Sequence, residues 1–307
     1  MQSFSVIGLG KLGLSIGVGL ATQGRLAWTL NRGVEHRNAA KFQLPQNLPM
    51  YASVSAIEEP TSCTILAVAD NALEEVSEQL AAQFGARLND MIVMHCSGAK
   101  KRDVLRACEA QGAITVGMHP YQTFMVATSK NFKDIVWGAE YPPVEPFRTI
   151  AEQFAQDLVY TLGGKISVLS PETLSHKPLY HASAVFAANY LNALIGFAAE
   201  TAQQAGIDPQ EFLPPIVRRS LENAITGVKQ IGSAKFPLTG PIARGDIAML
   251  REHLASIRTL PDAGAIIRAY CHFGIPTAEF ACKQGMIDAD KRQAIIALFE
   301  EELRSLA

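Results

Sequence analysis

Three glycines near the start of the chain have the spacing that a diphosphate-binding loop requires. Gly8, Gly10 and Gly13 form an unbroken G-x-G-x-x-G directly after the apolar run of residues 4–7. In such a loop the first glycine makes a tight turn, the second lets the backbone approach the diphosphate, and the third lets the next helix pack against the strand. The N-terminus of that helix adds N–H donors and a partial positive charge. The residues predicted to hold the dinucleotide are Gly8, Leu9, Gly10, Lys11, Leu12 and Gly13.

The end of the next apolar strand indicates which dinucleotide would bind. A carboxylate at this point accepts a hydrogen bond from the ribose 2′-OH of NAD, whereas a 2′-phosphate needs an arginine. The chain has Asn31 and Arg32 there. We therefore predict NADP(H), with both residues at the cofactor and with Arg37 or His36 as assistants. The alternative is that Arg32 is an ordinary solvated loop charge.

Two later strands are each followed by polar side chains, at the edge where a doubly wound sheet binds its ligands. These segments are residues 95–100 and 117–123. Hydride transfer to or from a carbon that bears OH or =O needs a group that gives or takes the hydroxyl proton, and histidine suits that work. We predict His119 as this acid/base. The alternative is a turn histidine that precedes Pro120.

Two further positions at this edge are assigned to the cofactor. Ser97 could orient a substrate or cofactor amide, although Ser-Gly after a strand is also ordinary turn chemistry. Ala69, at the end of the apolar run that begins at residue 63, is predicted to lie at the cofactor as well. We interpret His95 as structural, pointing into the sheet or just above it.

A second polar group, H-K-P-L-Y-H over residues 176–181, precedes a long apolar segment. Lys177 and His181 are four residues apart and so share one helix face, and Asn189 lies two turns further along near that face. A cation and an imidazole opposite the nicotinamide could polarise a carbonyl and bind a substrate carboxylate. The alternative is a solvated first turn, but polar groups within an apolar helix need partners, which favours a functional role.

Other patterns carry weaker predictions. Residues 238–246 place Arg244 and Asp246 between helices, and we expect Asp246 to be a helix N-cap. Arg244 could reach a substrate carboxylate, including one across a dimer interface. We expect no metal site, because the chain has no H-E-x-x-H and no cysteine pair, and His176 and His181 lack a chelating spacing.

The arrangement of strand-like and helix-like segments predicts the elements that position these residues. Their alternation through the first half is typical of a parallel, doubly wound sheet, and long apolar helical patterns follow from residue 170. We predict an α/β Rossmann domain over residues 1–169 and an all-helical substrate and dimerisation domain over residues 170–307. Strands are expected at 4–7, 26–30, 63–69, 91–95, 114–118, 135–138 and 165–169, with helices at 12–22, 73–84, 102–111 and 144–158.

Composition limits the classes of partner. The 307 residues are 48% hydrophobic and 18% charged, which is enough to build the cores of two domains. A formal charge of −2 gives no bulk attraction to nucleic acid or to an anionic membrane. Five cysteines without a C-x-x-C pair, and a start that lacks a signal-peptide pattern, predict a cytoplasmic protein. We interpret the apolar segment 182–199 as a bundle helix that a symmetric partner buries in part.

Several motifs together resemble a known family. These are the glycine loop, H-C-S-G-A at residues 95–99, G-M-H-P-Y-Q-T-F at 117–124, the segment 177–190 and the segment 238–246. They are similar to bacterial proteins, named as NADP oxidoreductases, that join a Rossmann-like domain to a C-terminal domain of unknown function. The resemblance covers essentially the whole chain. That family is similar to pyrroline-carboxylate reductases, prephenate dehydrogenases and β-hydroxyacid dehydrogenases, which share a 6-phosphogluconate dehydrogenase C-terminal-like helical domain and usually dimerise through it.

The resemblance also implies residue roles. Prephenate dehydrogenases carry a catalytic histidine before a proline after a late Rossmann strand, and His119-Pro120 matches that motif. Hydroxyacid dehydrogenases and ketopantoate reductases use a lysine with an asparagine four residues on. Lys177 matches the lysine, and His181 stands where the asparagine would be. The resemblance implies a cofactor class and names no substrate.

Three functions follow as hypotheses. The first is an NADP(H)-dependent oxidoreductase that acts on a small, carboxylate-bearing carbonyl or alcohol, with His119 as acid/base and Lys177 as electrophile. The second is a reductase of cyclic, pyrroline-type imines, whose substrate brings its own proton. The third is a non-catalytic protein that senses NADP(H) and whose helical domain binds a partner. In each case we expect a homodimer, a small-molecule ligand and no nucleic-acid or membrane partner.

Overall fold

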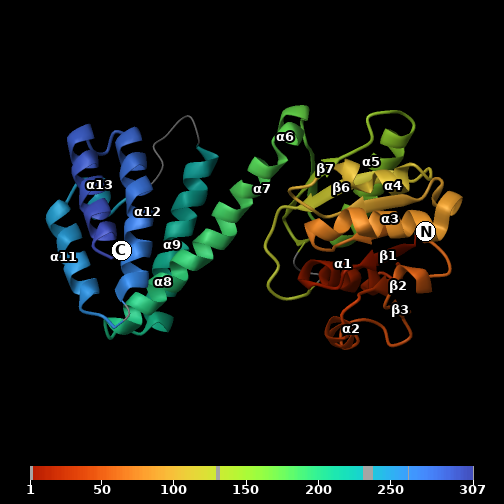
Figure 1. Ribbon diagram of the computed structural model, residues 1–307, viewed down its shortest axis with the longest axis horizontal. Helices are drawn as coiled ribbons and strands as arrows, with labels where there is room; N and C mark the ends of the chain where they lie inside the picture. The colour runs from red at the N-terminus through yellow and green to blue at the C-terminus, as the bar shows by residue number, and fades with distance from the viewer. Residues whose placement is uncertain (1–2, 129–131, 231–237, 262, 307) are drawn as a thin grey trace. The chain divides into compact units, whose positions relative to one another are not determined.

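A computed structural model describes residues 3–128, 132–230, 238–261 and 263–306 of the chain. The chain divides into two compact units, Met1–Ala188 and Asn189–Ala307. The first unit is built around an eight-stranded sheet, and the secondary structure of the described part of the second unit is helical (Figure 1). The predicted fold class, a Rossmann sheet followed by a helical region, is confirmed.

The sheet has the strand order β3-β2-β1-β4-β5-β6-β7-β8. The six strands from β3 to β6 in that order run parallel, whereas β7 is antiparallel to β6 and β8 is parallel to β7. The order of the strands reverses between β1 and β4, which is the point where such sheets bind ligands. The strands are β1 (Phe4–Ile7), β2 (Leu26–Leu30), β3 (Met50–Tyr51), β4 (Cys63–Leu66), β5 (Ile92–His95), β6 (Ile114–Pro120), β7 (Val136–Glu140) and β8 (Lys165–Val168).

Helices cover both faces of the sheet because its central strands bury side chains on both sides. In β1, Val6 belongs to one apolar core and the next residue, Ile7, belongs to the other. Helices α1 (Lys11–Thr22) and α5 (Phe147–Leu162) pack into the first core, and α3 (Leu73–Phe84) packs into the second (Figure 1). Strands buried on both faces read as continuous apolar runs, which is why the sequence located them well.

The remaining elements of the first unit show where the sequence patterns failed. The predicted helix at residues 102–111 is a 3₁₀ turn, η4 (Arg102–Leu105), followed by α4 (Arg106–Glu109), and the helix expected at 144–158 is shifted to α5. Strand β3 and helix α2 (Val34–Ala40) were not predicted, because two strand residues and a seven-residue polar helix give no periodic signal. Other short turns are η1 (Val54–Ala56), η2 (Asp70–Ala72) and η3 (Gly85–Leu88).

Residues 170–188 belong to the first unit, although they come after the predicted domain boundary at 169/170. They form α6 (Pro171–Ser175), α7 (Lys177–Val185) and the start of a π-helical turn, η6 (Phe186–Tyr190). Ser170 caps α6 by accepting a hydrogen bond from the amide of Thr173. Side chains of α7 form hydrogen bonds with residues of the sheet and its loops, as described below. These contacts explain why the boundary between the two units follows residue 188. How function divides between the two predicted domains stays a prediction.

The second unit packs its core mainly between three helices, α11, α12 and α13. Asp208 and Asp246 are the N-caps that the sequence predicts, since each carboxylate accepts a hydrogen bond from an amide of the first turn. The helices of this unit are α8 (Leu191–Gln204), α9 (Pro209–Lys229), α10 (Pro241–Arg244), α11 (Ile247–Arg258), α12 (Ala263–Lys283) and α13 (Ala289–Arg304).

One stretch among the described residues, Lys177–Gln204, is long and apolar enough to cross a membrane by length and composition. None of its most apolar window is buried within the single chain. Partial burial of this segment by a symmetric partner stays a prediction. Its first two turns carry Lys177 and His181, whose side chains face residues of the sheet unit. This single helix is weak evidence for a membrane span.

Candidate functional site

The glycine loop between β1 and α1 has the geometry of a diphosphate cradle. Gly8 has φ +95°, and a Cβ at that position would overlap the carbonyl oxygen of Ala67. A Cβ at Gly13 would overlap the carbonyl oxygen of Gly8, so the helix could not approach the strand. By contrast, a Cβ at Gly10 would have no atom within 4 Å. The protein's own packing therefore requires glycine at positions 8 and 13. Gly10 instead borders open space, where the backbone is expected to contact a ligand.

Helix α1 directs its N-terminus toward this open space. Its N-cap is Gly10, and no side chain caps the helix. The first-turn residues Lys11 and Leu12 follow, with no acidic side chain among them. Uncapped N–H groups and the positive end of the helix dipole favour an anion. The residues present therefore fit the diphosphate of a dinucleotide.

A cavity of about 530 Å³ lies at the switch point of the sheet. It is lined by the glycine loop, by the end of β2 and by the segment that follows β4, including Gly10, Asn31, Arg32 and Ala69. The predicted cofactor residues from these three segments are thus brought together. Ser97 does not line this cavity.

Leu9 does not line this cavity, and its predicted place at the cofactor stays a prediction. Its side chain is buried, and its amide donates to Oδ1 of Asn31 at 2.9 Å rather than facing the cavity. Asn31 also donates from Nδ2 to the carbonyl of Gly33. Arg37 donates to the backbone carbonyls of Asn31 and Arg32. Asn31 therefore ties the glycine loop to the loop after β2, and the Arg37 guanidinium fixes the turn within that second loop.

Arg32 is available to an anionic ligand. Its side chain is 70% exposed and lies 3.6 Å from Glu75, which is also exposed, so this surface ion pair contributes little. His36 and Ser53 line the same cavity. A guanidinium, an imidazole and a hydroxyl around one wall of the cavity could bind a 2′-phosphate.

The loop after β5 is a hydrogen-bonded turn. The Ser97 hydroxyl accepts from the amides of Ala99 and Lys100 at 3.2 and 3.0 Å, as in the turn interpretation of this Ser-Gly motif. The amide of Ser97 donates to Nδ1 of His95. His95 is fully buried, and its Nε2 has no hydrogen-bond partner among the described residues. His95 is thus buried in the sheet unit, and its structural role stays a prediction.

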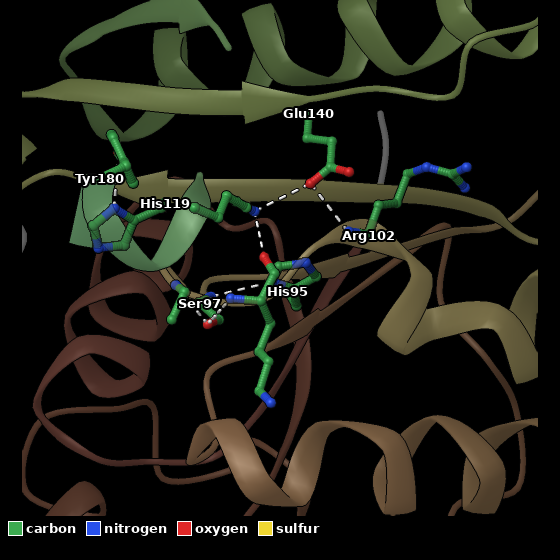
Figure 2. A network of polar contacts seen from close by, with 9 residues as sticks. His95, Ser97, Arg102, His119, Glu140 and Tyr180 are labelled. Atoms are coloured by element: carbon green, nitrogen blue, oxygen red, sulfur yellow. Dashed lines mark hydrogen bonds and ion pairs between the residues drawn. The ribbon is translucent and has the colours of Figure 1, made fainter. Parts of the chain in front are cut away.

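His119 stands at the carboxyl end of β6 within a group of aromatic side chains. Its Nδ1 lies 3.0 Å from the hydroxyl of Tyr180 on α7 (Figure 2). The His181 ring meets the His119 ring edge to face, with centroids 5.9 Å apart. Tyr121 lies against both His119 and Tyr180. The structure thus brings together His119 and His181, which were predicted from segments far apart in sequence.

Gly98 makes this arrangement possible. A Cβ on Gly98 would lie 2.7 Å from Nδ1 of His181 and 2.9 Å from Nε2 and Cε1 of His119. Both imidazoles therefore occupy the space that any other residue at this position would fill. Nδ1 of His181 is buried and has no hydrogen-bond partner among the described residues.

Burial controls the protonation of this group. It lowers the pKa of His119 from 6.5 to about 4, with further lowering by His181 and Lys177 and an opposing effect of Asp70. Burial also raises the pKa of Tyr180 to about 12. At neutral pH the His119 imidazole is therefore uncharged and the Tyr180 hydroxyl is protonated.

Lys177 lies near the His119 cluster and is almost completely buried. Its ammonium donates to Oε2 of Glu140 at 3.1 Å and to the carbonyl of Lys100, and its side chain is 2% exposed. Burial lowers the pKa of Lys177, and Glu140 partly offsets that effect. The predicted electrophile therefore already has partners within the protein.

The two remaining predicted substrate residues belong to the second unit. Asn189 is exposed in η6, and Arg244 is exposed at the end of α10. Their roles stay predictions. Sequence analysis missed Tyr180, Glu140, Tyr121 and Gly98 as site residues. Tyr180 lies within the H-K-P-L-Y-H motif and Gly98 within H-C-S-G-A, so both could have been found there, whereas nothing marked Glu140.

Two family models match the chain. The model of a Rossmann-like domain matches residues 2–120, and the model of DUF2520, a domain of unknown function, matches residues 144–274. No curated protein sequence matches the chain.

Solved structures share its fold at low sequence identity. A "putative NADP oxidoreductase" from Bacteroides fragilis is 17% identical with a TM-score of 0.69, covering 99% of this chain and 98% of the other. A reductive aminase from Aspergillus terreus, solved with NADPH, is 17% identical with a TM-score of 0.59 over 99% and 94%. A pyrroline-5-carboxylate reductase from Coxiella burnetii is 15% identical with a TM-score of 0.54 over 98% of each chain.

Proposed function

We propose that this protein is a cytoplasmic NADP(H)-dependent oxidoreductase that acts on a small carbonyl or alcohol substrate. Its chain combines a Rossmann-like domain with a DUF2520 domain. One observation carries the proposal. The open cradle at Gly10 and the hydrogen-bonded pair of His119 and Tyr180 occur in one unit, with the cradle after β1 and His119 at the carboxyl end of β6, a strand of the parallel part of the sheet. A cofactor in the cradle and a proton donor at His119 would thus lie at the same edge of one sheet. The structural relatives named for NADPH-dependent reduction support the cofactor class.

The cofactor residues divide the work of binding. When bound, NADPH supplies the hydride. The N-terminus of α1 would hold the diphosphate, and Arg32 would hold the 2′-phosphate through charge-assisted hydrogen bonds. Asn31 would hold the two binding loops together, and Arg37 would fix the loop that carries Arg32.

His119 and Tyr180 would supply the proton for a carbonyl substrate. Reduction of a carbonyl leaves an alkoxide, which is a stronger base than either side chain and must be protonated. Because His119 is neutral, it would donate from Nε2 while Nδ1 receives the proton of the Tyr180 hydroxyl, 3.0 Å away. Such a relay needs no imidazolium at neutral pH. The tautomer with the proton on Nε2 is part of this proposal.

Imine reduction is the second candidate, and the lowered pKa of His119 favours it. A protonated imine becomes a neutral amine when it accepts a hydride, so it needs no proton from the protein. A site that keeps its histidine uncharged also avoids repelling a cationic substrate. Two of the structural relatives are named as a reductive aminase and a pyrroline-5-carboxylate reductase.

One experiment separates the three hypotheses. NADPH consumption would be followed with pairs of carbonyl compounds and cyclic imines of matched shape, for the wild type and for the variants Tyr180→Phe and His119→Asn. A carbonyl reductase loses turnover in both variants, whereas an imine reductase retains it. Binding of NADPH, measured by fluorescence, without turnover of any compound would indicate the sensor instead.

A further inference from the structure

The carboxylate of Glu140 joins three segments of the first unit. Its Oε2 accepts from the ammonium of Lys177 at 3.1 Å and from the amide of Arg102 at 3.0 Å (Figure 2). Glu140 ends β7, Lys177 begins α7 and Arg102 begins η4. The side chains of Glu140 and Lys177 are 11% and 2% exposed, so solvent screens their attraction little.

The ammonium of Lys177 extends this connection to the loop after β5. It donates a second hydrogen bond to the carbonyl of Lys100, and the amide of Lys100 donates in turn to the hydroxyl of Ser97. The loop from residue 96 to 101 is therefore anchored at both its start and its end. Gly98 lies in the middle of this loop, and the imidazoles of His119 and His181 pack against it.

We propose that Glu140 and Lys177 are positioning residues, whose buried ion pair fixes the loop of residues 96–101 and thereby sets the places of the His119 and His181 imidazoles. Two of the three ammonium donors of Lys177 are used within the protein. A substrate carboxylate that approached the remaining donor would enter a buried site beside the Glu140 carboxylate, whose negative charge would repel it. Lys177 thus acts on the reaction through the loop and not as the electrophile that the sequence predicts. This inference takes its meaning from the proposed function, but its test requires neither substrate nor cofactor.

Amide hydrogen exchange of Ala99 and Lys100 in the free protein tests the inference. Both amides bond to Ser97 and neither bonds to the altered side chains, so they report the state of the loop. In Lys177→Met and in Glu140→Ala we expect these amides to exchange about tenfold faster or more, because the loop opens locally. Glu140→Gln keeps an acceptor oxygen but leaves Lys177 without its counter-charge, so exchange should be faster than in the wild type and slower than in Glu140→Ala.

Asp157→Asn is the matched control, since it breaks the Arg25–Asp157 ion pair on another part of the same unit. It should leave exchange at Ala99 and Lys100 unchanged. If Glu140→Ala does not fold, Lys177→Met still decides, because methionine replaces the buried stem at similar volume. Unchanged loop amides in a folded Lys177→Met protein would overturn the inference, since the loop would then support itself.

A second measurement detects displacement of the imidazoles. The groups around His119 that can carry charge are His181, Lys177 and Asp70, with the hydroxyls of Tyr180 and Tyr121 beside them. Glu140→Ala removes the counter-charge that raises the pKa of Lys177, so the titration of His119 could change without any movement of the ring. Displacement is therefore measured as loss of the nuclear Overhauser contact between the His119 and Tyr180 rings, whose centroids lie 5.6 Å apart. Loss of this contact in Glu140→Ala, but not in Asp157→Asn, supports positioning, and an unchanged contact in Glu140→Ala would contradict it.

These outcomes are distinct from failure of the proposed function. Without any turnover, the exchange and ring-contact measurements still report whether the pair positions the loop and the imidazoles. Conversely, suppose that an active enzyme with Lys177→Met shows a higher KM for carboxylate-bearing substrates and normal loop exchange. Lys177 would then be a substrate ligand, and the proposed oxidoreductase function would stand without this inference.

Discussion

The hydroxyl of Tyr180 lies 3.0 Å from Nδ1 of His119, which joins the helix after the sheet to the end of strand β6. Because burial keeps this histidine neutral, the hydroxyl is the nearest group that can restore a proton to it.

Removal of this hydroxyl is the first prediction. Tyr180→Phe should lower carbonyl turnover by about a hundredfold, the usual scale for loss of an acid/base group, while NADPH affinity stays unchanged. His119→Ala should do at least as much. Steady-state kinetics and cofactor titration measure both. The control is Tyr270→Phe, which removes the hydroxyl of the other His–Tyr pair, 2.8 Å from Nδ1 of His253. Unaltered turnover in Tyr180→Phe would exclude the relay.

Gly98 is the subject of the second prediction. In Gly98→Ala the new methyl would lie within 3 Å of both imidazoles, so one of them must move. We expect turnover to fall by about ten- to a hundredfold, because small misplacements of a catalytic group are costly, with little effect on NADPH binding. Gly196→Ala is the control, since a Cβ there has no neighbour within 4 Å. Turnover of Gly98→Ala equal to that of the control would show that the imidazoles adjust freely.

The third prediction concerns the choice of cofactor. If Arg32 binds the 2′-phosphate, Arg32→Ala should weaken NADPH binding by about 1.5–3 kcal/mol, or roughly ten- to a hundredfold, and leave NADH almost unaffected. Arg32→Asp should move the preference toward NADH, because a carboxylate repels the phosphate and accepts from a free 2′-OH. Titration of both cofactors decides this. Equal weakening of NADPH and NADH would make Arg32 a loop charge only.

Stability against acid provides the fourth prediction. Burial lowers the pKa of His95 from 6.5 to about 3, so between these values the unfolded chain binds a proton that the folded chain rejects. As far as His95 is concerned, the free energy of unfolding is therefore highest above pH 6.5 and falls as the pH drops from 6.5 toward 3. One such group contributes a slope of about 1.4 kcal/mol per pH unit.

His95→Asn isolates this contribution, because its Oδ1 can still accept from the amide of Ser97. Urea unfolding of both proteins between pH 4 and 7 should give a shallower pH dependence for the variant. Parallel curves would mean that His95 accepts its proton in the folded state.

Association of the chain is the fifth prediction. Leu179, Phe186 and Leu194 are exposed along the stretch Lys177–Gln204, and Leu194 also lines an apolar cavity of about 660 Å³ in the second unit. We expect a symmetric dimer that covers this surface, and Leu194→Asp should dissociate it. Light scattering measures the mass. Tyr160→Asp alters a residue that is 91% exposed in the first unit and should not affect the dimer. A monomeric wild type at micromolar concentration would refute the dimer.

The sequence predicted the fold better than the site, for a physical reason. Strands such as β1 and β5 are buried on both faces, so their local composition reveals them. Gly8 and Gly13 were identified because their backbone constraints are local in the chain. Glu140 gave no such signal. Its role depends on the ion pair with Lys177, 37 residues away, and on the antiparallel pairing of β7 with β6. The pKa of His119 likewise depends on burial, which no local pattern records.

Asn31 has a practical consequence for anyone who would redesign the cofactor preference. It occupies the position where dinucleotide-binding folds commonly carry an acid, so replacing it with aspartate is the obvious change. Its amide group, however, both accepts from Leu9 and donates to Gly33, and a carboxylate can do only the first. Such a replacement would lose the hydrogen bond to Gly33 and so destabilise the loop that determines the cofactor preference. Selectivity in this scaffold is better engineered at Arg32 and Ser53, which line the cavity and whose side chains do not tie the two loops together.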